Sequence, residues 1–226
     1  DPFPEVDLKS TENSWESYKW YVQRGAALFF YAQMLAYIKD VFALIYPNRA
    51  AKDIIVLEVG CSYGFLIDMA SELFGWDVMG IDPSPCARFG EHELGVKIID
   101  DYVENGVPEQ RFDAIISVQV LEHIPDLFSH LKAISELLKD SGFIFLTTPD
   151  AAVAALSVQV SPGEPMTLLS KNALEKLLIQ SGFESPCYLK PLLPEIMVVV
   201  AGKRDFNKEL CRSIKRHETD STMRYV

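Results

Sequence analysis

An apolar run that ends in a glycine turn constrains the fold of this sequence most. Residues 54–59 are rich in β-branched side chains, which is typical of a strand buried on both faces of a parallel sheet. The run ends in Glu58-x-Gly60-x-x-x-Gly64, and residues 65–70 after it are predicted to be helical. A strand, a glycine turn and a helix place free backbone N–H groups at the carboxyl edge of a sheet, where nucleotide-like ligands bind.

Strand and helix patterns alternate through the rest of the chain. Further strands are predicted at residues 76–81, 96–100, 112–118 and 142–148. Helices are predicted at residues 84–94, 126–139 and 170–180. The last two strands, predicted at 187–192 and 196–201, are too close for a helical crossover and must form an antiparallel hairpin. The pattern predicts an α/β fold, a doubly wound Rossmann-like seven-stranded sheet with a reversed strand at its edge.

The sequence predicts three segments. Residues 1–50 are expected to form an N-terminal helical lid or extension, 51–204 the ligand-binding domain, and 205–226 a polar tail. The apolar stretch at 26–38 is too short and interrupted for a membrane span. A helix buried against the core or a dimer partner, a lid over a pocket and a membrane-surface helix all fit it. Because the chain lacks an initiator Met and stops in a polar segment, it is expected to be cut from a longer protein or trimmed.

Charge and cysteine content exclude some classes of function. With 21 basic and 32 acidic residues, the formal net charge of −11 offers no basic stripe for a nucleic acid. The four cysteines, Cys61, Cys86, Cys187 and Cys211, have no Cys-x-x-Cys spacing. This pattern predicts neither a zinc site nor a disulfide framework, and it favours reduced thiols in the cytoplasm.

A second element strengthens the evidence for a nucleotide-like ligand. Asp82 ends the neighbouring strand, 22 residues beyond Gly60, and is followed by Pro83. A carboxylate there can accept both hydroxyl hydrogens of a ribose, although a turn residue before proline is the alternative. A dinucleotide fingerprint would carry glycines where Ser62 and Phe65 stand, so no pyrophosphate cradle is predicted.

These motifs resemble those of a known enzyme family. Residues 58–64 (Glu-Val-Gly-Cys-Ser-Tyr-Gly), 80–84 (Gly-Ile-Asp-Pro-Ser) and 112–124, which contains Leu-Glu-His, resemble the class I S-adenosylmethionine-dependent methyltransferases. The resemblance covers about residues 53–203 and includes the antiparallel hairpin. It implies that S-adenosylmethionine is the cofactor and that residues 51–204 bind it.

The resemblance also implies a role for individual residues. The glycine turn packs against the methionine part of the cofactor, the acid after the second strand holds the ribose, and a polar residue after the third strand meets the adenine amine. The backbone after the fourth strand closes the methionine side, and a residue before the first strand binds the carboxylate. The implied cofactor residues are Glu58, Gly60, Cys61, Ser62, Gly64, Asp82, Pro83, Asp101, Tyr102, Val118, Gln119, Tyr21 and Arg24. Most family members have glycine where Ser62 stands, and a serine can occupy such a turn and cap the following helix.

The segment Gln119-Val-Leu-Glu122-His123 carries the candidate catalytic groups. Some relatives have Glu-x-x-Glu-His here and hold a divalent metal with it. An amide oxygen is a poorer ligand than a carboxylate, so no metal is expected in this chain. His123 is instead the candidate general base, with a packing or capping histidine as the alternative. Glu122 is predicted either to react or to orient the loop.

The predicted function is methyl transfer to a small-molecule acceptor, most simply to a hydroxyl oxygen of a sugar, polyketide or quinone-like compound. One alternative is a nicotinamide-dependent oxidoreductase on the same sheet plan. The other is a catalytically silent cofactor-binding scaffold within a longer protein. The expected partners are the small acceptor and either a second copy of the chain or further attached domains.

Overall fold

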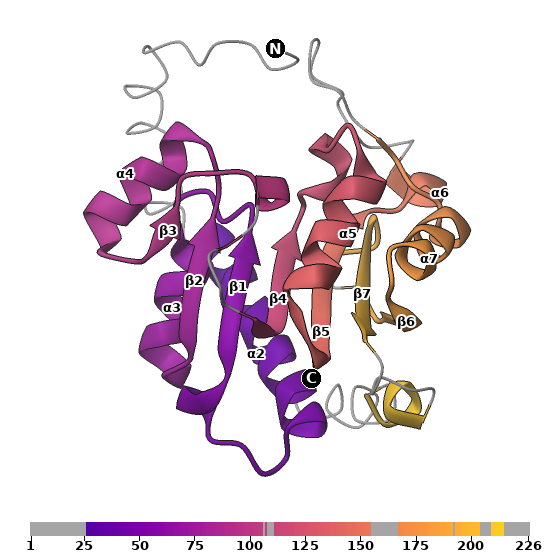
Figure 1. Cartoon of the computed structure of the whole chain (residues 1–226), viewed down its shortest axis with the longest axis horizontal. Coiled ribbons are helices and arrows are strands. Elements are labelled where there is room, and N and C mark those ends of the chain that lie inside the picture. Colours follow the sequence, from indigo (N-terminus) through magenta and orange to yellow (C-terminus); the bar gives the residue numbers. More distant parts are fainter. Residues whose placement is uncertain are drawn as a thin grey trace.

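A single mixed sheet forms the centre of the molecule. The computed structural model describes residues 26–105, 107, 111–154, 167–191, 193–203 and 209–214. The strands are β1 (Ile55–Val59), β2 (Asp77–Ile81), β3 (Ile98–Ile99), β4 (Phe112–Val118), β5 (Leu138–Pro149), β6 (Glu184–Leu189) and β7 (Ile196–Gly202). Their order is β3-β2-β1-β4-β5-β7-β6, and β1 to β5 run parallel with their carboxyl ends upward in Figure 1.

The predicted fold class and edge hairpin are confirmed. β7 pairs antiparallel with both β5 and β6, so the reversed strand lies one place in from the edge rather than at the edge itself. β3 is shorter than predicted, at two residues. β5 is longer than predicted, because it begins at Leu138 immediately after the preceding helix ends.

Helices cover both faces of the sheet (Figure 1). The longer ones are α2 (Ala26–Ile45), α3 (Phe65–Phe74), α4 (Pro85–Leu94), α5 (Leu127–Leu137) and α7 (Lys171–Gln180). The short ones are α6 (Ala151–Ala154) and the 3-10 turns η1 (Ala51–Asp53), η2 (Val103–Asn105) and η3 (Leu121–His123). α2 and α3 pack on one face, whereas α5 and α7 pack on the other. α6 follows β5 in the chain, and residues 155–166 lie outside the described part.

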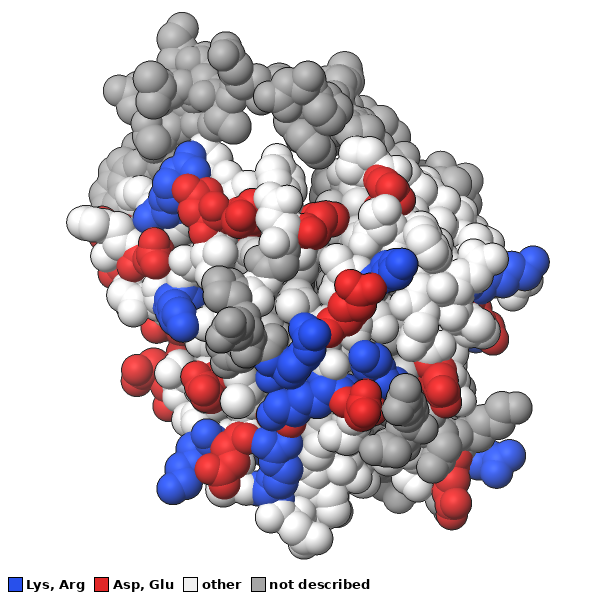
Figure 2. Space-filling view, in the orientation of Figure 1, with Lys and Arg blue, Asp and Glu red and all other residues white. Residues whose placement is uncertain are grey.

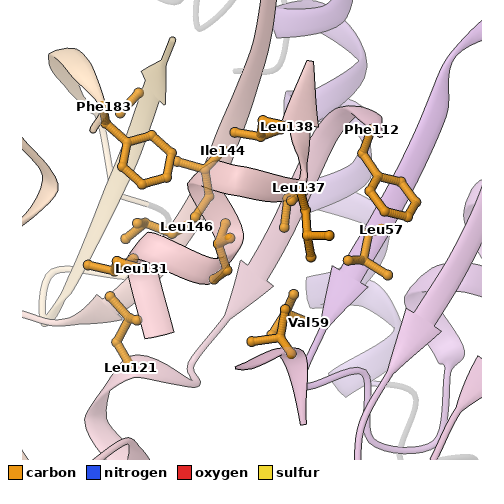
Figure 3. Close-up of a cluster of buried hydrophobic side chains, with 14 of the residues drawn as sticks. Leu57, Val59, Phe112, Leu121, Leu131, Leu137, Leu138, Ile144, Leu146 and Phe183 are labelled. Atoms are coloured by element: carbon orange, nitrogen blue, oxygen red, sulfur yellow. The ribbon is translucent and has the colours of Figure 1, made fainter. Parts of the chain in front are cut away.

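The core between the sheet and α5 is a continuous apolar cluster (Figure 3). Leu57 and Val59 of β1, Phe112 of β4 and Ile144 of β5 face Leu137 of α5, and each is at most 5% exposed. Burial of apolar surface is the main favourable term in folding, about 25 cal/mol for each Å² removed from water. The strand ends that carry the candidate site are therefore fixed by a packed core beneath them.

α2 is a core helix, although its sequence is apolar almost all round. Its residues Met34, Leu35, Ile38 and Phe42 form a buried stripe against the sheet. Within the described residues, Leu28–Ile45 is the one stretch long and apolar enough to cross a membrane, with a mean hydropathy of 1.5. The expectation that this region is too short for a span was therefore wrong, whereas the buried stripe supports the predicted core helix. The division at residues 1–50, 51–204 and 205–226 stays a prediction.

A charged cluster lies at the amino ends of the parallel strands, at the end of the sheet opposite the glycine turn. The Asp113 side chain is 1% exposed and accepts hydrogen bonds from Arg49 at 2.5 and 3.0 Å, from Lys139 at 2.9 Å and from the Ile55 backbone at 2.9 Å. The Tyr46 hydroxyl donates to the Asp113 carbonyl oxygen at 2.9 Å. The cluster therefore ties the end of α2 to the starts of β1, β4 and β5.

The cysteine prediction needs a correction. Cys187 of β6 forms a disulfide with Cys211, which lies in a helical segment at residues 209–214. Their Cα atoms are 5.6 Å apart, although 24 residues separate them in sequence. The pair carries no spacing signal because the tertiary fold, not a local motif, brings the two side chains together. Cys61 and Cys86 are not part of this disulfide.

Candidate functional site

The turn after β1 has the geometry that its glycines predict. Gly60 (φ +73°) and Gly64 (φ +76°) adopt left-handed conformations, and the Gly60 N–H donates to the Ile81 carbonyl oxygen at 2.9 Å. Ser62 is also left-handed, at φ +48°, which is unfavourable for a residue with a side chain. Gly64, and not Ser62, is the N-cap of α3, and no side chain caps this helix. The expectation that Ser62 caps the helix is therefore wrong.

Asp82 holds this turn in place. Its Oδ2 accepts a hydrogen bond from the Ser62 backbone N–H at 2.8 Å, and its Oδ1 accepts one from the Ser84 backbone N–H at 2.7 Å. The side chain is 8% exposed, so these bonds are shielded from water. A carboxylate has about four lone-pair sites, so both oxygens can accept further hydrogen bonds. Contact of Asp82 and the adjacent Pro83 with ribose and adenine stays a prediction.

Glu58 lies buried beside Asp82, at the carboxyl end of β1. It is 3% exposed, and its Oε2 has no hydrogen-bond partner within the described part of the chain. Burial, followed by the nearby charge of Asp82, raises the pKa of Glu58 well above its ordinary value. An orphaned acid in this place fits a ligand that brings hydroxyl or ammonium donors to the turn, as S-adenosylmethionine does.

The glycine turn packs against α4. The Cys61 thiol is buried with Ile67, Ala87 and Ile98, and burial raises its pKa, so only the backbone of this predicted cofactor residue is offered to a ligand. Tyr63 is 3% exposed and packs edge-on against Phe89 of α4. Sequence reasoning did not predict this support, because contact between α4 and the turn depends on the tertiary fold.

Gly90 of α4 is where the helix meets the turn most closely. A Cβ added at Gly90 would lie 2.0 Å from the carbonyl oxygen of Tyr63. Alanine normally stabilises a helix interior by about 1 kcal/mol over glycine, but here the collision with backbone is expected to reverse the sign. We expect Gly90→Ala to destabilise the protein by about 1–3 kcal/mol and to weaken cofactor binding.

Chemical denaturation and calorimetry with S-adenosylhomocysteine measure both effects of Gly90→Ala. His92→Ala, two residues away on the exposed side of α4, is the matched control and should change neither value. A Gly90→Ala protein as stable as the wild type would show that the turn moves aside freely.

The end of β4 closes over the turn. Gln119 has φ +55°, and its backbone N–H donates to the Thr147 carbonyl oxygen at 3.0 Å. Its side-chain Nε2 donates to the Thr147 hydroxyl at 3.1 Å. Val120 follows and lies directly over Gly60, where an added Cβ would come 2.4 Å from its Cγ2 atom. The structure thus brings the backbone at Val118–Gln119 to the turn, although sequence reasoning missed Val120.

Glu122 and His123 have different surroundings. Glu122 is 3% exposed, and its Oε2 accepts a hydrogen bond from the Thr148 hydroxyl at 3.1 Å. Burial is the main reason that its pKa is raised, and its carbonyl oxygen accepts from the Thr167 N–H at 2.8 Å. Glu122 therefore fixes η3 in place. The His123 side chain is exposed at the carboxyl edge of the sheet.

The Gln119 and Glu122 side chains are not arranged to bind a divalent cation. The Gln119 amide is hydrogen-bonded to Thr147, and the buried Glu122 carboxyl is hydrogen-bonded to the Thr148 hydroxyl. Burial raises the pKa of Glu122 above its ordinary value. Among the described residues, no group of three or more His, Cys, Asp or Glu side chains is placed to hold a metal ion. The absence of a metal stays an expectation.

The segment after β3 reaches the same edge. The Asp82 N–H donates to the Ile99 carbonyl oxygen at 3.0 Å, which places residues 100–102 beside the end of β2. Asp101 Oδ1 accepts from the Tyr102 N–H at 2.7 Å and from Asn105 Nδ2 at 2.6 Å. Both predicted adenine residues therefore lie near the turn, and the choice between them stays open. Tyr21 and Arg24 lie outside the described residues.

Comparison with known proteins decides the family. The family model described as a methyltransferase domain matches residues 30–186, which is more than half of the chain. The chain belongs to the methyltransferase domain family. The family and enzyme-class predictions are confirmed, S-adenosylmethionine is the methyl donor of this class, and the match favours methyl transfer over the nicotinamide alternative.

Individual relatives agree with this assignment. The methyltransferase is 37% identical over 101 residues to a ubiquinone biosynthesis O-methyltransferase of Proteus mirabilis, covering 41% of each chain. It is 25% identical over 144 residues to the protein of the same name in Azorhizobium caulinodans, covering 58% of this chain and 56% of that one. The matches thus span about half of these relatives' length. DesVI of Streptomyces venezuelae shares the fold, with a TM-score of 0.66, 14% identity, and coverage of 89% of this chain and all of that one.

Proposed function

We propose that this methyltransferase moves a methyl group from S-adenosylmethionine to a hydroxyl oxygen of a small, phenol- or quinone-like acceptor. One observation carries the proposal: Asp82 pins the glycine turn, and the exposed histidine of Leu-Glu-His stands at the same sheet edge. The named relatives, which are ubiquinone biosynthesis O-methyltransferases, support a hydroxyl acceptor. Location in the cytoplasm, a homodimer and attachment to further domains stay predictions.

Surface charge supports a small acceptor over a nucleic acid. On the face in Figure 2, acidic side chains and one group of basic atoms lie in the upper part, where the parallel strands end, and acidic and basic side chains are mixed lower down. On this face, the edge that carries the candidate site therefore offers no basic band to a phosphate backbone. An uncharged or cationic acceptor suits such an edge better.

The residues have separate tasks in this mechanism. The bound cofactor supplies an electrophilic methyl group on its sulfonium. The turn and Asp82 hold the donor, and alignment of an acceptor oxygen in line with the bond to be broken can lower the barrier by about 7–11 kcal/mol. His123 removes the proton from the acceptor hydroxyl, while Glu122, bonded to Thr148, holds η3 in the orientation that presents His123.

A turnover assay tests the proposed function. The purified chain is incubated with S-adenosylmethionine and a panel of catechols, phenols, hydroxyquinones and matched amines, and S-adenosylhomocysteine is quantified by mass spectrometry. We expect turnover with at least one hydroxyl acceptor and none with its amine counterpart. Binding of the cofactor without turnover across the panel would favour the catalytically silent scaffold.

The variant His123→Ala tests whether His123 is the general base. General-base catalysis contributes about 10²–10⁴-fold to a rate, so we expect kcat to fall about 100-fold. Cofactor affinity should stay within about twofold, because the His123 side chain is exposed and is not among the residues predicted to hold the cofactor. His92→Ala, another exposed histidine, is the matched control and should keep full activity. Undiminished turnover in His123→Ala would make His123 a packing residue.

A further inference from the structure

A buried histidine outside the predicted site joins α5 to the segment after β3. The His130 side chain is 3% exposed, and its Nδ1 lies 2.7 Å from Oε1 of Glu104 in η2. The hydrogen bond with His130 is the main reason that the pKa of Glu104 is lowered. An ionised carboxylate can only accept a hydrogen bond. His130 therefore donates from Nδ1.

A histidine at position 130 lowers the stability of the fold compared with an apolar residue. It stands beside Leu131 and Ile134, which are fully buried, and its Nε2 has no hydrogen-bond partner among the described residues. An unpaired buried polar atom costs free energy, and a leucine would fill the position without that cost. The hydrogen bond to Glu104 is thus the property that the imidazole adds here.

Glu104 lies in η2, between residues of a small hydrogen-bonded unit that contains both predicted adenine residues. Asp101 accepts from the Tyr102 N–H and from the Asn105 side chain, and the Asn105 N–H donates to the Tyr102 carbonyl oxygen at 3.1 Å. Val103 is 3% exposed and packs into the same core as α5. Val103 and Glu104 are therefore the two points at which α5 fixes this unit.

We propose that His130 is a positioning residue for the adenine end of the cofactor: through Glu104 it sets the position of Asp101 and Tyr102 against the turn. The inference rests on the proposed function, since it assumes that the cofactor binds at the sheet edge. His130 acts through η2 and does not touch the cofactor. Loss of its hydrogen bond weakens recognition of the adenosine part and leaves the methyl-transfer step intact.

Three variants of the whole chain separate positioning from simple packing. His130→Leu removes the donor and keeps an apolar side chain, whereas His130→Asn keeps an N–H close to the place of Nδ1. Glu104→Gln removes the charge at a side chain that is 34% exposed and is therefore expected to fold. Calorimetry measures the Kd of S-adenosylhomocysteine and of adenosine for each variant, alongside Tm, kcat and KM.

We expect His130→Leu and Glu104→Gln each to raise the Kd of both ligands about tenfold, because both ligands carry the adenosine part. His130→Asn should stay within about threefold of the wild type, and kcat at saturating cofactor should change less than twofold in all three. The double variant His130→Leu/Glu104→Gln should bind both ligands no more weakly than the single variant that has the higher Kd.

Four results would overturn the inference. A lower Tm with unchanged Kd in His130→Leu and Glu104→Gln would make the pair structural only. A loss of S-adenosylhomocysteine affinity without a loss of adenosine affinity would move the effect to the methionine end. If the wild-type chain binds neither ligand, the proposed function and this inference both fail. If the wild type binds the ligands and the variants bind them with the same Kd, the inference alone fails.

Discussion

Asp113→Ala is expected to destabilise the protein by about 3–5 kcal/mol. The carboxylate accepts two hydrogen bonds from Arg49, one from Lys139 and one from the Ile55 backbone, and its side chain is 1% exposed. Removing it leaves an unpaired backbone donor at the start of β1 and two cations without their counter-charge. Urea unfolding of the two proteins measures the difference in the free energy of unfolding.

Asp77→Ala is the matched control for this change. Asp77 is the first residue of β2 and Asp113 the second of β4. Asp77 pairs in register with Ile55 and is exposed. Its replacement is expected to change stability by less than about 0.5 kcal/mol. Equal losses in the two variants would show that the cluster around Asp113 contributes no more than any acid at this edge.

The same cluster predicts a pH dependence. Burial would raise the pKa of Asp113, but the hydrogen bonds from Arg49, Ile55 and Lys139 together outweigh it and lower the pKa. A lowered pKa in the folded state contributes stability that is complete above the unfolded value of about 3.9 and is lost as the pH falls through the folded value. Asp113→Asn should therefore lose less stability than the wild type between about pH 5 and pH 2, and an unchanged acid limb would contradict this.

Asp82→Ala is expected to weaken cofactor binding by about 100-fold or more, close to 3 kcal/mol. Hydrogen bonds to charged groups contribute about 1.5–3 kcal/mol each, and Asp82 is predicted to make them to the ribose. The structure adds a second loss, because the Ser62 and Ser84 N–H groups would lose their common acceptor. With Ser62 already left-handed, the turn would relax away from the shape that binds the donor.

Calorimetry with S-adenosylhomocysteine measures the effect of Asp82→Ala. Asp100→Ala is the control: this side chain is 51% exposed, pairs with Arg88 on the surface and should change affinity less than twofold. Asp82→Asn keeps one acceptor oxygen, so an affinity between those of the wild type and Asp82→Ala is expected. Wild-type affinity in Asp82→Ala would remove Asp82 from the site.

Local patterns predicted the parts of the site that lie next to one another in sequence. The β-branched run before Gly60 and the position of Asp82 both report strand ends, and the ends of parallel strands meet at one edge of a sheet. Gln119 and Glu122 were correctly placed at that edge, but their partners Thr147 and Thr148 were not predicted. Those partners lie on another strand, 28 and 26 residues away, and no spacing rule joins them.

The sequence by itself determined the sheet plan, the glycine turn, the acid at the tip of β2 and the family, because periodicity, turn chemistry and motif spacing are local properties. Only the tertiary structure decided that Cys187 pairs with Cys211, that Arg49 and Lys139 share Asp113, and that His130 holds Glu104. Each of these pairs joins separate elements whose contact depends on how the helices pack on the sheet. The sequence pattern indicates which face of a helix or strand is apolar. Which side chains come into contact is decided only when the elements pack together.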